Sequence, residues 1–234
     1  MRGSAIALGL AVGWLTLLIY PQPLFAYSVH QNNLVLYART PLPEQAGPIL
    51  DEAQRRIARS PLYDPTRTQH AFLCDTPALF AFLTLTNRSG GKTNPFGNVF
   101  IRPANVARNR VIDRFGNEKS SARSLTYYLA HELTHALTFD HLGFRQWANP
   151  LSAFQIEGYA DYVGMSEPID LRAGRAALIS NAPEMDPTRS GLYTRYSLLV
   201  AYLLERRGYS VEQLLARRIQ QRDVEAELRL DTGQ

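Results

Sequence analysis

Residues 125–137 decide how this chain is organised, and they read Leu125-Thr-Tyr-Tyr-Leu-Ala-His131-Glu132-Leu-Thr-His135-Ala-Leu137. Apolar residues recur there at helical spacing, and the pattern predicts one long helix from Ser121 to about His141. Two residues four positions apart lie on the same face of a helix. His131 and His135 can therefore turn a ring nitrogen toward one metal ion.

Two histidines at this spacing, with a carboxylate beside the first, form a pattern that binds zinc. Glu132 borders the same site, where it can take a proton from a water molecule next to the metal. We therefore predict Zn2+ as the cofactor, His131 and His135 as two of its ligands, and Glu132 as a general base.

A catalytic zinc site typically has three protein ligands and one open position. Glu157 lies 22 positions after His135, which leaves room for a loop and a second helix that returns to the metal. Asp161 follows four residues later on the same helix face, where it can accept the second ring proton of a ligand histidine. The alternative is that both acids form an exposed pair on a helix surface.

His141 is a second candidate for the third ligand, because three histidines at positions 131, 135 and 141 match another large group of helix-based zinc peptidases. That group has glycine three residues after the second histidine, where the chain turns sharply. This sequence has Thr138 there, and a β-branched residue is poorly suited to positive φ. Met165 could correspond to the methionine turn of that group, but simple packing also explains it.

The motif from His131 to His135, followed by Glu157-Gly-Tyr-Ala-Asp161-Tyr162, resembles the gluzincin metallopeptidases, the thermolysin-like and peptidase-MA-like proteins. The resemblance covers about 35 residues, with weaker similarity over residues 196–208. It implies an upper lobe with a small sheet, a mainly helical lower lobe, and a zinc site in the cleft between them. It also implies that an edge strand aligns an extended substrate, for which Gly97–Arg102 is the candidate.

The chain departs from thermolysin-like enzymes at the group that stabilises the oxyanion, since no histidine follows His141. Other gluzincins use a tyrosine downstream of the glutamate helix, so the resemblance points to Tyr193 and Tyr196. Packing is the alternative role for either residue, because the chain has 12 tyrosines.

Residues 1–26 read as an export segment, with Arg2 before an apolar centre from Ala5 to Tyr20. Leu24-Phe25-Ala26 is an imperfect cleavage site, so a cleaved signal peptide and an uncleaved membrane anchor both fit. We expect the remainder to be extracytoplasmic, either secreted or periplasmic, or attached to the membrane through this segment. The fold is expected to begin at about Tyr27.

The chain has 234 residues, of which 45% are hydrophobic and 20% charged, and this is typical of a globular protein. The net charge of +4 comes from scattered Lys and Arg, without the basic stripe of a nucleic-acid-binding protein, so no nucleic-acid partner is expected. The single cysteine, Cys74, lies in an apolar run and is expected to be buried.

The predicted fold class is α+β, with a small mixed sheet followed by helices. Residues 27–221 are expected to form one domain, divided into a sheet-containing part (27–120) and a helical part (121–221), with a polar tail at 222–234. Strands are predicted at 33–39, 70–74 and 97–102. Helices are predicted near 49–59, 76–83, 121–141, 152–164, 193–207 and from 210 onward.

Together these patterns predict a zinc metallopeptidase that hydrolyses peptide bonds in a peptide or protein substrate. The alternative is a non-catalytic, zinc-stabilised extracytoplasmic protein that binds peptides or a partner. A structural zinc site would be closed by four protein ligands, for example if His141 joined the other three.

Overall fold

The computed structural model describes residues 2–119, 123–143, 150–186 and 193–231, with only the backbone described for 2–5. The predicted helix start at Ser121 lies outside these residues. The chain forms two compact units, one made of Met1–Arg55 and Asp64–Ala136 and the other of Arg56–Tyr63 and Leu137–Gln234. A small mixed sheet and many helices make up the structure, so the predicted α+β class is confirmed.

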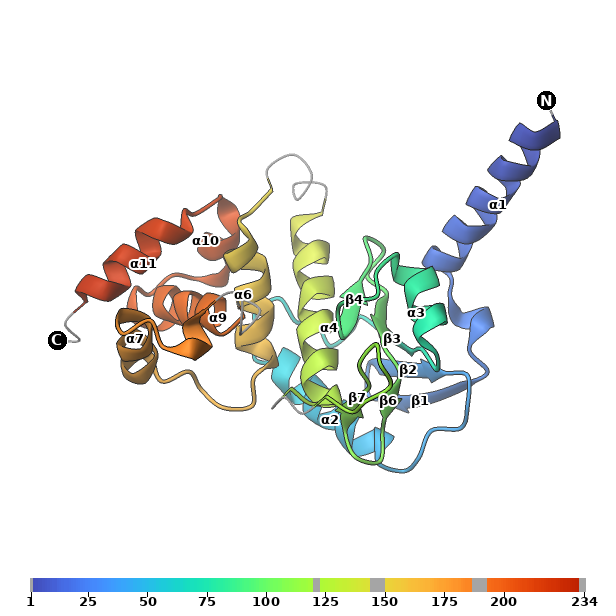
Figure 1. Cartoon of the computed structure of the whole chain (residues 1–234), viewed down its shortest axis with the longest axis horizontal. Helices are drawn as coiled ribbons and strands as arrows, with labels where there is room; N and C mark the ends of the chain where they lie inside the picture. Colours follow the sequence, from blue (N-terminus) through green and yellow to red (C-terminus); the bar gives the residue numbers. More distant parts are fainter. Residues whose placement is uncertain (1, 120–122, 144–149, 187–192, 232–234) are drawn as a thin grey trace. The chain divides into compact units, whose positions relative to one another are not determined.

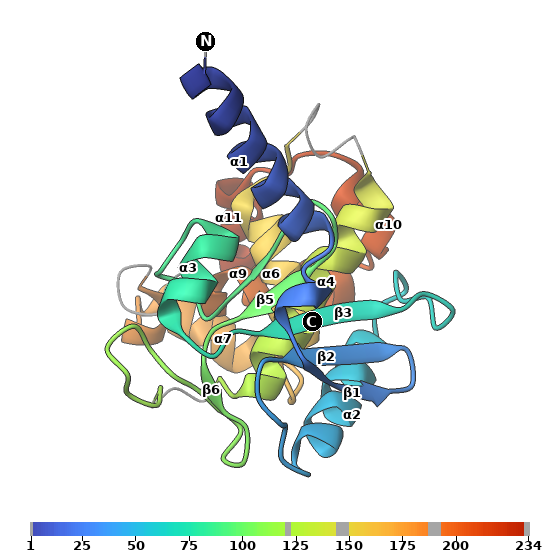
Figure 2. The same cartoon turned by 90° about the vertical axis from the view of Figure 1, so that its right-hand side faces the viewer.

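The main sheet of the first unit has three parallel central strands and one antiparallel strand at each edge (Figures 1 and 2). Its order across the sheet is β1 (Tyr27–Gln31), β2 (Leu34–Ala38), β3 (Gln69–Leu73), β5 (Val99–Ile101) and β4 (Gly91–Thr93). A separate hairpin joins β6 (Ala104–Asn105) and β7 (Arg110–Val111). The central strands β2, β3 and β5 are the three that the sequence predicts.

The prediction that Gly97–Arg102 forms an edge strand is wrong. Gly97–Arg102 contains β5, which pairs with β3 on one side and with β4 on the other. The edge strand on that side of the sheet is β4, in a segment whose Gly, Ser and Lys content predicts a loop. The residues of β5 are apolar because both faces of this central strand are buried. An edge strand does not require such a continuous apolar run.

One face of the sheet is aromatic. Tyr37, Phe72 and Phe100 occupy matching positions on neighbouring strands, and the Tyr37 ring stacks on Phe72 with centroids 4.9 Å apart. Phe80 and Leu83 of α3 (Pro77–Thr84) belong to the same buried cluster. The predicted cap of α3 is present, because the Thr76 hydroxyl accepts a hydrogen bond from the Leu79 amide.

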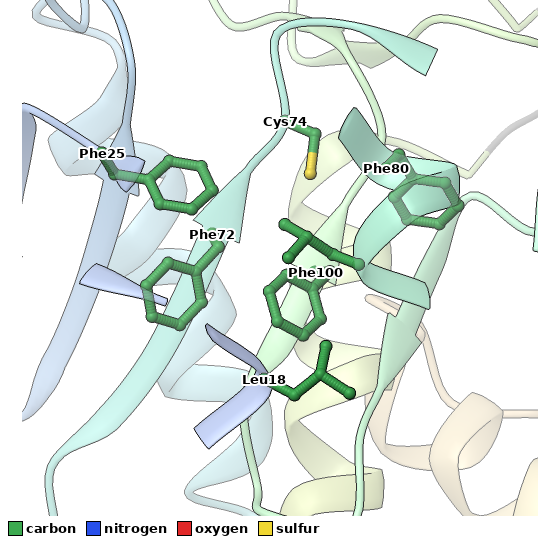
Figure 3. Packing of buried hydrophobic residues seen from close by; sticks show 7 residues of the cluster. Leu18, Phe25, Phe72, Cys74, Phe80 and Phe100 are labelled. Atoms are coloured by element: carbon green, nitrogen blue, oxygen red, sulfur yellow. The ribbon is translucent and has the colours of Figure 1, made fainter. Parts of the chain in front are cut away.

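The N-terminal segment is part of this core, contrary to the expectation that the fold begins at Tyr27. It contains α1 (Arg2–Ile19) and the 3-10 turn η1 (Gln22–Leu24). Leu18 and Phe25 pack with Phe72, Cys74 and Phe100 (Figure 3). Sequence alone did not reveal this, since an apolar run of this kind is explained equally well by export.

Among the described residues, no helix combines the length and the apolarity that crossing a membrane requires.

Helix α2 (Ala46–Ile57) confirms the predicted amphipathic pattern. Its apolar positions Ile49, Leu50, Ala53 and Ile57 are all buried. Gln54 on this helix exchanges hydrogen bonds with the side chains of Asn32 and Asn33 in the turn between β1 and β2. The turn is thereby fixed to α2.

The described part of the second unit is mainly helical. Its predicted helices are α6 (Ala153–Gly164), α9 (Tyr193–Ala201), which continues into the π-helical turn η3 (Tyr202–Arg206), and α10 (Val211–Ala216). The sequence did not predict α7 (Leu171–Ile179), η2 (Pro183–Met185) or α11 (Gln221–Leu230). Gly158 allows α6 to pack closely on α9, because a Cβ there would lie 2.6 Å from the carbonyl oxygen of Tyr196.

The residues set apart as a polar tail form most of α11. Val224 and Leu228 on this helix are buried four positions apart. Arg195 of α9 makes two hydrogen bonds to the Glu225 carboxylate, one of them 2.7 Å long from Nε. The sequence did not predict this helix, because only a narrow apolar stripe lies among its many charged residues.

Candidate metal centre

Helix α4 (Leu125–Leu142) carries the predicted metal-binding motif and is fixed at its start by two side chains. The Ser124 hydroxyl accepts a hydrogen bond from the Tyr127 amide, and the Asn109 side chain accepts one from the Thr126 amide. The helix runs through Thr138 without a break and ends before Gly143, whose φ is +52°. The sharp turn of the three-histidine group is therefore absent at Thr138.

His131 and His135 point their Nε2 atoms at a common position. These atoms are 3.2 Å apart, the two rings are nearly perpendicular, and both side chains are buried. Two histidine nitrogens bound to one tetrahedral zinc at about 2.0–2.1 Å would lie about 3.3 Å apart. The pair therefore fits the grip that the sequence predicts for one metal ion.

Glu157 joins this pair. One ligand atom from each of His131, His135 and Glu157 lies within 4.8 Å of the other two, so the group could hold a metal ion. His141 does not belong to the group and is exposed near the end of α4. Two imidazoles and one carboxylate are a donor set that suits zinc, although the same donors also bind other divalent transition metals.

Glu132 lies against the edge strand β4. The Thr93 hydroxyl is 2.9 Å from Oε2 of Glu132 and 2.7 Å from its backbone carbonyl oxygen. A Cβ at Gly91 would lie 2.6 Å from Cγ of Glu132, which no side chain there could tolerate without a shift. Gly91 and Thr93 thus define where the Glu132 side chain can lie. Sequence reasoning missed both residues because it assigned them to a loop.

Tyr127 is a further residue that the sequence analysis did not single out. Its hydroxyl lies 3.4 Å from Nδ1 of His131, one helical turn away, and the tyrosine is buried. A proton on Nδ1 directed at this hydroxyl leaves Nε2 free to bind a metal. The signal was present in the sequence, since Tyr127 is four positions before His131.

Asp161, the predicted partner of a ligand histidine, lies on α6 one turn after Glu157 and has no exposed surface. A solvated helix pair is therefore excluded for Asp161. Its hydrogen bond to a histidine stays a prediction.

The two candidate oxyanion residues lie on α9, where Tyr196 is buried and Tyr193 is partly exposed. Burial raises the pKa of Tyr196; the charge of Arg195 lowers it, while the charges of Glu157 and Glu225 raise it further. A raised pKa keeps the hydroxyl protonated, and a protonated hydroxyl can donate a hydrogen bond. Tyr196 thus lies within the electrostatic field of the predicted ligand Glu157.

Comparison of the chain with protein-family models and with curated protein sequences found no match.

Proposed function

We propose that this protein is a zinc metallopeptidase of the gluzincin type, in which His131, His135 and Glu157 hold the metal and Glu132 is the general base. The observation that carries the proposal is the grouping of two imidazole nitrogens and one carboxylate oxygen within 4.8 Å, next to a buried glutamate. Three ligands leave a coordination position open, as catalytic zinc sites do.

A bound zinc ion would polarise the substrate carbonyl and lower the pKa of a water molecule. The chain's own part in the reaction begins with Glu132, which accepts the proton of the attacking water and later delivers it to the leaving amine. Thr93 and Gly91 hold the carboxylate in place during both transfers. Tyr196 donates its hydroxyl proton in a hydrogen bond to the developing oxyanion.

The substrate is a peptide or protein segment that pairs with β4. This strand is one of the two edge strands of the sheet, and its Gly91 and Thr93 lie against Glu132. A substrate that pairs with its backbone therefore lies next to the general base. Pairing between main chains places few demands on substrate side chains, so broad sequence specificity is expected.

Metal analysis tests the ligand set. Purified wild type should hold one zinc per chain, whereas the Glu157→Ala and His131→Ala variants should lose it. His141→Ala is the matched control, because it removes an exposed histidine from the same helix. If His141→Ala lost zinc and Glu157→Ala retained it, the three-histidine arrangement would replace the one proposed.

Activity analysis tests the reaction. Wild type is incubated with casein and with a pool of unstructured peptides, and the products are identified by mass spectrometry. Glu132→Gln should keep its zinc and lose turnover, because the amide cannot accept the proton. Full activity of that variant would refute the mechanism. If zinc-loaded wild type bound the peptides but cleaved none, the non-catalytic binding protein would be the better description.

A further inference from the structure

The N-terminal helix α1 has two regions with different surroundings. Its last turns contact the rest of the first unit, where Leu18 is 8% exposed. Its earlier part extends away from the sheet and α3 (Figures 1 and 2) and exposes large apolar side chains. These are Ile6, Leu8, Leu10, Val12 and Leu15, with exposed fractions between 46% and 71%.

The base of α1 is bound by specific polar contacts as well as by packing. The Asn98 side chain donates hydrogen bonds to the carbonyl oxygens of Leu18 and Ile19, at 2.9 and 3.1 Å. The Asn94 side chain donates another to the Leu18 carbonyl oxygen at 2.8 Å. The last carbonyl groups of a helix have no hydrogen-bond donor within the helix. Here the side-chain amides of two buried asparagines donate to them.

Residues before and after Leu18 and Ile19 also contact the rest of the first unit. The Trp14 indole donates a hydrogen bond to the carbonyl oxygen of Phe82, 3.0 Å away, near the end of α3. Phe25 packs on Phe72 with ring centroids 5.1 Å apart. Removal of the segment would expose the aromatic face of the sheet around Phe72 and leave Asn94 and Asn98 without these acceptors.

The exposed part of α1 is apolar on all sides. Ile6 and Leu10 lie on one side of the helix, whereas Leu8 and Val12 lie on the roughly opposite side. A groove in a partner protein covers only one stripe of a helix, so it would leave half of these side chains in water. A hydrocarbon solvent covers all of them. Ten residues from Ile6 to Leu15 rise about 15 Å, roughly half of the ~30 Å hydrocarbon core of a bilayer.

We propose that α1 stays on the mature protein as a lipid-inserted element whose base, the segment from Trp14 in the helix to Phe25 just after it, is part of the folded first unit. This proposal decides between the cleaved and uncleaved segments that the sequence left open. It is independent of the proposed peptidase activity. Insertion of the exposed part into lipid does not require the helix to cross the bilayer.

The first test is the mass of the mature full-length chain recovered from the membrane and soluble fractions of expressing cells. The expected mass includes residues 6–25, which contain both the exposed part of α1 and its base. A mature protein that begins after residue 15 would overturn the proposal, because the exposed apolar part of α1 would then be missing.

The second test uses vesicle flotation with phosphatidylcholine alone, since the net charge of +4 could attract the protein to anionic lipid without insertion. Wild type should float with the vesicles, and the double variant Leu8→Ser/Leu10→Ser should not. Leu85→Ser is the matched control, because Leu85 is 76% exposed but lies at the end of α3. Equal flotation of the double variant and wild type, or no flotation of wild type, would refute lipid insertion.

The third test measures attachment of the base through Cys74, the single cysteine, which is buried in the cluster around Leu18. In the full-length chain, Leu18→Ala should speed alkylation of Cys74 by about tenfold or more. Leu15→Ala should leave the rate unchanged, because Leu15 is exposed on the same helix. If both variants alkylated like wild type, the base of α1 would not be part of the fold. The double variant of the flotation test should also keep Cys74 protected, which separates lost lipid contact from unfolding.

Discussion

The Thr93 hydroxyl lies within hydrogen-bonding distance of both the carboxylate and the backbone carbonyl of Glu132, and so ties the edge strand to the metal helix. Thr93→Val keeps the shape of the side chain and removes the hydroxyl. Zinc content should be unchanged, whereas kcat should fall about 10- to 100-fold, because the proposed general base Glu132 would lose a positioning contact. Thr93→Ser, which keeps the hydroxyl, should retain most of the activity. Comparable losses in both variants would mean that packing at Thr93, and not the hydrogen bond, supports catalysis.

Gly91 should be intolerant of even a methyl group. In Gly91→Ala the new Cβ would lie 2.6 Å from Cγ of Glu132 and 3.0 Å from its Oε1, so the carboxylate must move. We expect zinc to stay bound and kcat to fall about 100-fold. Gly47→Ala in α2 is the control, since a Cβ there meets nothing within 4 Å. Normal kinetics of Gly91→Ala would show that Glu132 can act from another rotamer.

Tyr196 and Tyr193 can be separated by their phenylalanine variants. Tyr196→Phe should reduce kcat about 10²- to 10³-fold with little change in KM, as loss of one oxyanion donor does. Tyr193→Phe should change kcat much less, because Tyr193 is partly exposed, whereas Tyr196 is buried and the charge of Glu157 raises its pKa. Steady-state kinetics at saturating zinc make the comparison. The reverse order of effects would assign the donor role to Tyr193.

The contact between α9 and α11 should depend on pH. Burial alone would raise the pKa of Glu225, but hydrogen bonds from Arg195 and Gln221 and the charge of Arg195 outweigh it and lower the pKa. A carboxyl group whose pKa is lowered on folding stabilises the fold above its unfolded pKa of about 4.3, and this stabilisation disappears as pH falls through the folded value. The melting temperature of wild type should therefore decrease as the pH drops under about 5. The melting temperature of Glu225→Gln should decrease less over the same pH range.

At neutral pH, Glu225→Gln should lower the free energy of unfolding by about 1 to 3 kcal/mol, the range for hydrogen bonds to charged groups. Glu227→Gln on the same helix is the control, because its ion pair with Arg207 is about half exposed. The control should change stability by no more than about 0.5 kcal/mol. Identical acid profiles for wild type and Glu225→Gln would show that other carboxylates govern the pH dependence.

The attachment of α1 should also be visible in equilibrium stability. Leu18→Ala removes a buried side chain and should lower the free energy of unfolding by about 2 to 4 kcal/mol. Leu15→Ala, three residues earlier, should change it by less than about 0.5 kcal/mol. Denaturant unfolding in a mild detergent measures both variants under conditions that keep the apolar helix dispersed. Equal stabilities would place Leu18 outside the cooperative core.

The metal motif could be predicted from sequence because helical periodicity places His131 and His135 on one face without any tertiary information. The continuation of the helix past Thr138 followed from the β-branched side chain at that position. Glu157 required one further assumption, that a second helix returns to the metal. The separation of 22 positions from His135 to Glu157 leaves room for such a return. Sequence separation alone does not establish that the two residues meet.

The supporting residues could not be predicted because they depend on strand pairing. Gly91-Lys-Thr93 is too short and too polar to read as a strand, and only its pairing with β5 brings Thr93 to Glu132. The base of α1 was missed for a different reason. An apolar segment before position 26 has one common explanation, export, which hides any second role in the core.

The length of β4 has a consequence for which proteins such an enzyme could attack. Only three residues, Gly91 to Thr93, form this strand, and a chain that adds to it must already be fully extended over that distance. Helices and paired strands within stable domains cannot supply such a stretch without unfolding first. Natively disordered linkers, damaged proteins and chains that have not yet folded can supply it. Selection among proteins would then depend on conformational state more than on amino-acid sequence.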